Sequence, residues 1–382
     1  MLSDYSKTEL ENLAKLYGYK GSNKLKKQQL LELLKELRVN NMKEILLTLE
    51  IEDIEQFEEL IVSDKVIDSE DDEDDEAYDF EQEYEHYNDY AYERAPEDEI
   101  LDYEKLIGLG LVEQYNRNYD VILTVDPTLK AAYENLDRVA IKQKAQSNTF
   151  LKKHILGLVN IYGAVEIDWV LKLYQRDYQD ELSQKGLIAF IQKDDMLSET
   201  LGVIDHYIVE ENIYNIDEDN FYHFIKAVQN KPYYVPTQEY IMLMSSPTYY
   251  ENTIQVQNLK SYIRKNFTQN KALIEEAIFT VVMMGRVDCS DNNSVVEMIL
   301  QEWDRLFDMR NPVKVKGAIE NILRVTNSTR KWINRGYTPD ECRPVSLSQN
   351  LDSKVTVVDF TRNALCSCGS GKRYKKCCDK KE

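Results

Sequence analysis

One stretch of this chain cannot enter a folded core, and it divides what remains. Residues 68–99 contain seventeen acidic side chains and a single base, Arg94, which gives the stretch a net charge of −16. Six aromatic residues interrupt the acids, but they cannot bury enough apolar surface to offset the charge and the chain entropy. We therefore expect residues 63–99 to form an acidic, disordered linker. A sharper alternative is that the acids mimic a nucleic acid and compete for basic residues elsewhere in the chain.

The rest of the chain is close to neutral and long enough for two or three domains. The 382 residues carry −21 in total, so the residues outside the acidic stretch carry only −5. This balance does not exclude a nucleic-acid-binding protein. Since no run of eighteen apolar residues occurs, we expect no membrane insertion. The N-terminus shows no apolar signal region, and we expect a cytoplasmic protein.

Four of the six cysteines lie together near the end of the sequence. Two are separated by one residue, eight residues follow, and the other two are adjacent. Structural zinc sites use four such thiolates, and glycines after the first pair allow the backbone to turn back towards a metal. Two disulfides are the alternative, but in a reducing cytosol clustered cysteines are more often metal ligands. The predicted zinc ligands are Cys366, Cys368, Cys377 and Cys378, whereas Cys289 and Cys342 stand alone.

The cluster resembles the SEC-C motif, the zinc-binding tail of the SecA motor ATPase that also occurs in YecA-type proteins. Besides the four ligand positions, the runs at 369–372 and 374–376 match the centre of the motif, with Arg373 a like-charge departure. The resemblance implies a non-catalytic module that docks on the ribosome or the SecB chaperone and holds zinc, or alternatively iron. No counterpart of the SecA ATPase body is present, so translocation is not implied. The residues expected to contact the partner are Lys372, Arg373, Tyr374, Lys375 and Lys376.

Residues 1–62 are expected to form a helical module with a positively charged face. Ser6 and Glu9 have the spacing of a capping box, and Gly18 and Gly21 interrupt a helical leucine pattern. The segment is similar to the SAP and Rho N-terminal helix–extended-loop–helix modules, which bind DNA or RNA. Lysines around the loop would contact phosphates with little sequence preference; a solvated lysine face on a small bundle is the alternative. These lysines are Lys15, Lys20, Lys24, Lys26 and Lys27.

Residues 100–230 are expected to form a winged-helix-like α+β region. The patterns indicate a strand at 121–125, a helix from Pro127, helices at 149–162, 166–176 and 182–193, and a two-stranded wing from 202–209 and 212–216. Such a domain can bind DNA through its third helix. Here that helix (181–195) is poor in the side chains that read base edges, so we favour a protein-interaction role or a degenerate wing over a reader of DNA sequence.

A proline-punctuated connector (231–252) leads to a predicted helical bundle at 253–345. Apolar residues recur at core spacing, and Asn311 followed by Pro312 marks the start of the last helix. We expect that helix to extend to about Gly336 and to present binding residues, although a basic last turn that balances the helix dipole is the alternative. The binding residues are Arg330, Trp332 and Arg335. A linker with a strand follows at 346–361, and the zinc knuckle occupies 362–382.

No constellation in the sequence supports catalysis. The four histidines are scattered, and a zinc ion with four thiolate ligands leaves no position open for a substrate. We expect a mainly α, multidomain and non-enzymatic protein. The first interpretation is an adaptor that docks through the knuckle on a ribosome, another nucleic-acid partner or a SecB-like chaperone. The second is a transcription-linked regulator led by the N-terminal and winged-helix-like modules, and an enzyme with an unrecognised active site in the bundle is the third.

Overall fold

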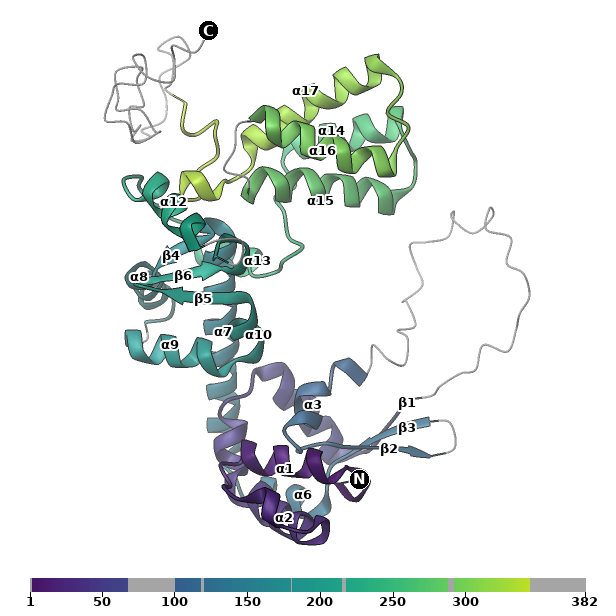
Figure 1. Cartoon of the computed structure of the whole chain (residues 1–382), viewed down its shortest axis with the longest axis vertical. Helices are drawn as coiled ribbons and strands as arrows, with labels where there is room; N and C mark the ends of the chain where they lie inside the picture. The colour runs from purple at the N-terminus through teal and green to yellow at the C-terminus, as the bar shows by residue number, and fades with distance from the viewer. Residues whose placement is uncertain are drawn as a thin grey trace, which may run out of the picture. The chain divides into compact units, whose positions relative to one another are not determined.

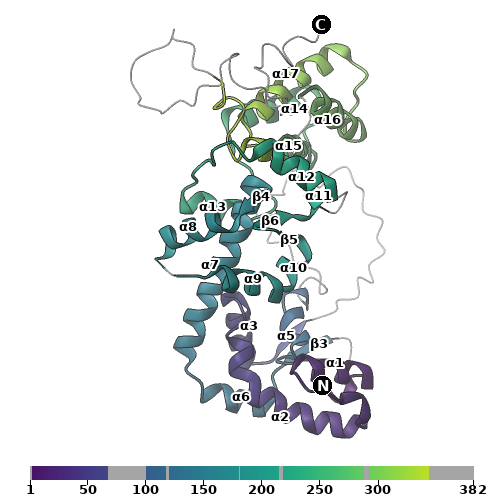
Figure 2. The ribbon, with the colours of Figure 1, turned by 60° about the vertical axis from the view of Figure 1, so that its left-hand side comes forward.

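The chain forms two compact units, residues 1–150 and 151–382 (Figures 1 and 2). The computed structural model describes residues 2–67, 100–117, 120–179, 181–214, 218–287 and 292–343. Helices dominate in this part of the chain, as expected, and two small antiparallel sheets accompany them. The acidic stretch, the strand expected near 353–360 and the zinc knuckle lie outside the described residues.

Unit 1 begins with a helix, a loop and a second helix. Its first elements are η1 (Leu2–Asp4), α1 (Lys7–Leu16), η2 (Ser22–Lys24) and α2 (Lys27–Leu46). The predicted capping box is present, because the Glu9 N–H donates to Ser6 Oγ and the Ser6 N–H donates to the Glu9 carboxylate. Gly18 and Gly21 turn the chain with φ of 76° and 97°, a region that favours glycine. These local features follow directly from the sequence pattern.

The rest of unit 1 is a small sheet with helices around it. Its elements are α3 (Ile51–Val62), β1 (Lys65–Ile67), α5 (Glu104–Gly108), β2 (Glu113–Arg117), β3 (Asp120–Thr124) and α6 (Pro127–Glu134). The strands have the order β1–β3–β2, and Val66 of β1 pairs with Ile122 of β3. The strand predicted at 121–125 and the helix predicted from Pro127 are confirmed. Neither β1 nor β2 was predicted.

Residues from both sides of the acidic stretch share one core. Phe57 and Ile67, which precede the stretch, are buried in the same cluster as Leu106 and Tyr133, which follow it. The unit continues to residue 150, so the boundaries expected at residues 62 and 100 do not coincide with a boundary between compact units. The physical reason is that β1 finds its hydrogen-bonding partner only in β3. The acidic stretch is therefore an insertion whose two ends belong to the same unit, not a connection between two units.

A fully buried arginine fastens α2 to this core. Arg38 Nη1 donates to the Gly110 carbonyl at 3.0 Å and to the Glu113 carboxylate at 3.1 Å, and Nη2 lies 3.6 Å from the Asp126 carboxylate. A guanidinium can stay charged in a core when carboxylates and carbonyls surround it in this way. The sequence offered no sign that this base differs from the solvated lysines before it.

The first part of unit 2 alternates helices and short strands. After the C-terminal half of α7 (Arg138–Tyr162) the elements are β4 (Ala164–Glu166), α8 (Ile167–Tyr178), α9 (Gln184–Lys193), α10 (Asp195–Thr200), β5 (Leu201–Ile204), β6 (Tyr207–Glu210), α11 (Glu211–Tyr214) and α12 (Glu218–Val228). The sheet order is β4–β6–β5. The helices predicted at 149–162, 166–176 and 182–193 correspond to α7, α8 and α9, and a hairpin follows them. Neither β4 nor α10 was predicted, and the winged-helix assignment stays a prediction. The segment at 212–216 was predicted as a strand, whereas residues 212–214 belong to α11, because β5 and β6 already form the hairpin.

The second part of unit 2 is a helical bundle, visible as α14 to α17 in Figures 1 and 2. Its elements are α13 (Gln238–Met244), α14 (Ile254–Asn266), α15 (Lys271–Val287), α16 (Asn292–Leu306), α17 (Pro312–Ser328) and η3 (Trp332–Asn334). The predicted cap is confirmed, since the Asn311 side chain accepts from the Val313 and Lys314 N–H groups. Trp303 and Ile322 are fully buried in the bundle core.

The last helix of the bundle is shorter than predicted. It ends at Ser328 instead of near Gly336, and Thr329 is extended. The Ser328 and Thr329 hydroxyls both donate to the Val325 carbonyl, which would otherwise accept from the next turn of helix. Arg330, Trp332 and Arg335 therefore lie beyond α17, with Trp332 in the short 3-10 helix η3, and the predicted extension of the helix to about Gly336 is wrong.

None of the helices in the described part of the chain is both long enough and apolar enough to cross a bilayer.

Candidate functional site

The four cysteines predicted to hold zinc lie outside the described residues. Their chemistry fits the metal, because four thiolates are a donor set of structural zinc sites. Among the described residues, no group of three or more His, Cys, Asp and Glu side chains is placed to hold a metal ion. Cys342 is half-buried, and burial raises the pKa of its thiol, so the thiol is protonated at neutral pH. The predicted metal centre thus rests on the cysteine cluster alone.

The five lysines predicted to bind nucleic acid are exposed in unit 1, around the loop between α1 and α2. Lys15 donates to the Asn12 side chain at 3.3 Å. Within the described part of the chain, the other four make no side-chain hydrogen bond or ion pair. The four are Lys20, Lys24, Lys26 and Lys27.

Three of these lysines surround the start of α2. Lys24 ends η2, Lys26 is the N-cap residue, and Lys27 is the first residue of the helix. The first turn of α2 contains no acidic residue. Because a helix N-terminus already carries partial positive charge, added cations here cost stability but strengthen the attraction for an anion. We call Lys15, Lys20, Lys24, Lys26 and Lys27 the N-terminal lysine face.

Arg330, by contrast, is held among partners inside unit 2. Its guanidinium stacks on Tyr234, with Cζ 3.7 Å from the ring centroid. Nη1 donates to the Gly336 carbonyl and to the Glu341 carboxylate, both at 3.0 Å. Nε is buried, and no hydrogen-bond acceptor for it occurs among the described residues. A ligand would have to displace these partners, so a binding role for Arg330 stays a prediction.

Trp332 and Arg335 are equally enclosed. Trp332 Nε1 donates to the Asn160 carbonyl at 3.0 Å, and its ring lies so close to Gly163 that a Cβ there would be 2.5 Å from it. The Arg335 guanidinium lies 4.0 Å from the Tyr233 ring centroid and 3.4 Å from the Glu166 carboxylate. Together the three side chains fasten the segment after α17 to the first part of unit 2. These contacts give them a structural role, and the binding role again stays a prediction.

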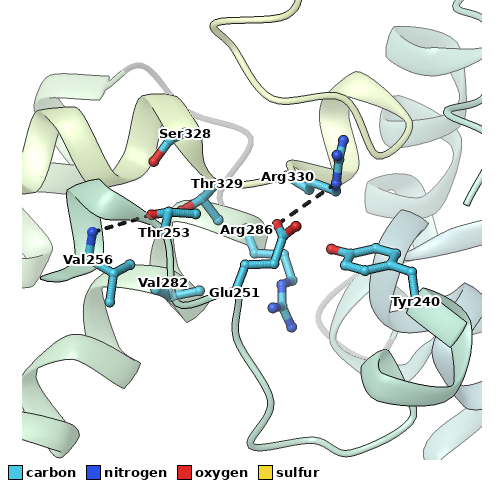
Figure 3. Close-up of a pocket in the computed structure, with 9 residues that line it drawn as sticks. All are labelled: Tyr240, Glu251, Thr253, Val256, Val282, Arg286, Ser328, Thr329 and Arg330. Carbon is cyan, nitrogen blue, oxygen red and sulfur yellow. Dashed lines mark hydrogen bonds and ion pairs between the residues drawn. The ribbon is translucent and has the colours of Figure 1, made fainter.

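Figure 3 shows a small polar cavity beside Arg330. Its volume is about 10 Å³, and its lining is Tyr240, Glu251, Thr253, Val256, Val282, Arg286, Ser328, Thr329 and Arg330. Arg286 is buried, donates to the Tyr249 carbonyl at 3.3 Å and to two methionine sulfurs, and burial lowers its pKa. A cavity of this size holds about one water molecule and no organic substrate. Arg286 follows an apolar run in α15, and no sequence pattern singled it out.

His154 is the histidine most removed from solvent among those described. It is fully buried, its Nε2 lies 3.3 Å from the Val170 carbonyl, and Nδ1 has no partner among the described residues. Burial lowers the pKa of His154 to about 4, so the ring is neutral at physiological pH. Tyr174 and Tyr178 cover it with ring centroids 5.4 and 5.8 Å away. Without access to a substrate, this histidine has a packing role.

Comparison with known protein families finds a match for one short segment of the chain. The SEC-C motif matches residues 362–379, which include Cys366, Cys368, Cys377 and Cys378. No curated protein matches the chain, and no solved structure matches it. The SAP, Rho N-terminal, YecA-type and winged-helix assignments therefore stay predictions. What the comparisons show for this chain is a SEC-C motif at residues 362–379.

Proposed function

We propose that this protein is a non-enzymatic adaptor that docks on its partner through a zinc-loaded SEC-C knuckle. The observation that carries the proposal is the SEC-C match at 362–379 with all four cysteines in place. Zinc binding would supply the folding energy that so short a segment cannot obtain from a core. The partner classes that suit the motif are the ribosome, another nucleic-acid assembly or a SecB-like chaperone.

The charge of the knuckle favours a polyanionic partner. Residues 360–382 contain seven bases and two acids. Four thiolates and one zinc ion together contribute −2, so the loaded knuckle has a net charge of +3. Lys372, Arg373, Lys375 and Lys376 would meet phosphates, and Tyr374 would stack or pack beside them. The N-terminal lysine face would provide a second contact of the same kind.

Metal content and ribosome co-sedimentation of the full chain test the proposal. The double variant Cys377→Ser/Cys378→Ser should lose its zinc, measured by elemental analysis, and should no longer sediment with ribosomes. Cys342→Ser is the matched control, because this half-buried cysteine lies outside the motif, and it should keep both properties. If the double variant binds ribosomes as the control does, docking through the knuckle is refuted.

A second candidate is a transcription-linked regulator that binds DNA or RNA through unit 1, with the knuckle as an accessory. The exposed lysines around the start of α2 favour it. The variant Lys24→Glu/Lys26→Glu/Lys27→Glu should abolish a salt-sensitive gel shift. Reversal of Lys43, Lys144 and Lys226, three exposed lysines elsewhere, changes the net charge equally and should leave the shift in place. Equal shifts for both triple variants would reject this candidate.

A further inference from the structure

Two neighbouring helices of the bundle form a surface that the sequence reading did not assign. The helices α14 and α17 pack against each other in opposite directions. The Tyr262 hydroxyl donates to the Lys314 carbonyl at 2.7 Å, and a Cβ on Gly317 would lie 2.3 Å from that hydroxyl. At the other end, Val256 and Ser328 line the same small cavity. The start of α17 therefore lies beside the end of α14, and Figures 1 and 2 show the two helices side by side.

The charges of the bundle are segregated on this pair. Helices α14 and α17 contain six bases and one acid, whereas α15 and α16 contain three bases and five acids. The whole chain carries −21, so a helix pair with a net charge of +5 is a local reversal. The charged residues of the pair are Lys260, Arg264, Lys265, Lys314, Lys316, Arg324 and Glu320.

Two of the six bases have partners within the bundle. Lys260 pairs with Glu275 at 2.6 Å, and Lys314 donates to the Asn266 carbonyl at the end of α14. The other four are exposed, and no side-chain ion pair or hydrogen bond is found for them within the described residues. We call these four residues, Arg264, Lys265, Lys316 and Arg324, the bundle cations.

The bundle cations are arranged in two exposed stripes. On α17, Lys316, Glu320 and Arg324 recur every four residues and are all exposed. The two cations of this stripe are about 12 Å apart along the helix axis, from 1.5 Å of rise per residue. On α14 the exposed positions also follow helical spacing. Ile254, the first residue of the helix, is apolar. The other exposed positions are polar, and they are Gln257, Asn258, Ser261, Arg264 and Lys265.

Helix stability does not account for these charges. Arg264 and Lys265 suit the last turn of α14, where cations compensate the helix dipole. Lys314, however, lies in the first turn of α17, Lys316 follows two residues later, and no acid occurs in that turn. Cations at a helix start are unfavourable, and here they gather next to two more cations on α14. The helix dipole therefore does not explain why Lys316 lies at this place.

We propose that the α14/α17 face docks on a nucleic-acid backbone through the bundle cations, without reading the base sequence. Protein partners are recognised chiefly through apolar or aromatic anchors near the centre of the interface. The exposed large apolar side chains of the two helices are Ile254 and Val313, each at the start of its helix, and no exposed aromatic residue occurs on either helix. Interfaces with nucleic acid are polar and positively charged, and amide and hydroxyl side chains such as Asn258 and Ser261 contact phosphates and sugars. The surface deepens the proposed adaptor function by naming a nucleic-acid partner, but it acts independently of the knuckle and the N-terminal lysine face.

Binding of the zinc-loaded full chain to a labelled DNA duplex of random sequence tests this inference. The variant Arg264→Glu/Lys265→Glu/Lys316→Glu/Arg324→Glu should bind at least about tenfold more weakly, and the slope of log affinity against log salt should fall by about 3. The matched control reverses Lys144, Lys193, Lys226 and Lys271, four exposed lysines elsewhere, and should keep the slope of the wild type. Replacing the bundle cations with Gln removes their charge without adding acids, and covers the case in which the Glu variant does not fold.

The outcomes separate this inference from the proposed function. If the Glu and Gln variants bind the duplex like the control, while Cys377→Ser/Cys378→Ser abolishes ribosome binding, the inference is refuted and the adaptor function stands. If the bundle variants lose duplex binding while Cys377→Ser/Cys378→Ser keeps it, the inference stands and the knuckle is not needed for duplex binding. If the wild type binds polyglutamate but not the duplex, the face recognises an acidic protein, and the nucleic-acid assignment is overturned.

Discussion

The N-terminal lysine face and the Arg330–Arg335 segment contain the same class of side chain in opposite environments. The lysines are exposed around a loop, whereas Arg330 and Arg335 lie over tyrosine rings and beside carboxylates. The chemistry of the two side chains explains the difference. A guanidinium is planar, weakly hydrated and able to stack, while an ammonium group remains strongly hydrated. In this chain, lysines around a loop are exposed, whereas arginines next to aromatic residues in the fold are packed against them.

The largest expected effect concerns Arg38, which lies in the same module as the lysine face. Arg38→Ala should lower the free energy of unfolding by about 3–5 kcal/mol, because Glu113 and Asp126 would remain in or near the core without their partner. Urea unfolding followed by circular dichroism measures this. Lys24→Ala is the control and should change stability by less than about 0.5 kcal/mol, as expected for an exposed side chain. Similar losses in both variants would remove the distinction between buried arginine and exposed lysine.

His154 extends the comparison to a buried base that is neutral. Burial lowers its pKa from 6.5 to about 4, so the unfolded chain binds a proton that the folded chain does not accept between these values. Stability is fully present above pH 6.5 and falls as the pH decreases towards 4, by up to about 3 kcal/mol from this group. Urea unfolding at a series of pH values should show this loss in the wild type. In His154→Leu that component should be missing, and an unchanged pH profile would contradict the assignment.

Arg330 tests whether the segment after α17 is a structural fastening. Arg330→Ala removes a stacked guanidinium and two hydrogen bonds, and should destabilise unit 2 by about 2 kcal/mol. Arg330→Lys keeps the charge but not the planar stack, so it should restore only part of that loss. Thermal unfolding gives both values. If neither substitution changes stability while partner binding is lost, Arg330 is a binding residue and the structural role is wrong.

The features that the sequence predicted are those that depend on neighbouring residues. The capping box of Ser6 and Glu9 and the cap at Asn311 follow from spacing within one helical turn. A hairpin after the third helix was predicted for the same reason, but its strands were expected at 202–209 and 212–216, whereas β5 and β6 both lie within 201–210. In contrast, β1 was missed because its partner β3 lies beyond the acidic stretch.

The candidate sites divide in the same way. The cysteine cluster is local in sequence, and the SEC-C match confirms the motif. The environments of Arg38 and Arg330 depend on residues far away in the chain, so the sequence alone did not predict them. The bundle cations were missed because they become one surface only when α14 and α17 pack together. A search for exposed bases at four-residue spacing would have found Lys316 and Arg324, with Glu320 between them.

The smallest effect concerns how the two helices of the N-terminal module begin. Ser6 completes a capping box in α1, while α2 has only half of one: the Lys26 N–H donates to the Gln29 side chain at 2.9 Å, but Lys26 provides no side-chain cap. Lys26→Ser should complete that box and raise stability by about 1 kcal/mol, and Ser6→Ala should lower it by a similar amount. Thermal unfolding of both variants measures the two changes in stability.

Lys26→Ser should also weaken binding to a nucleic acid, because it removes one cation from the start of α2. A gain in stability together with unchanged affinity would show that Lys26 contributes nothing to binding, and the lysine face would then lose its central member.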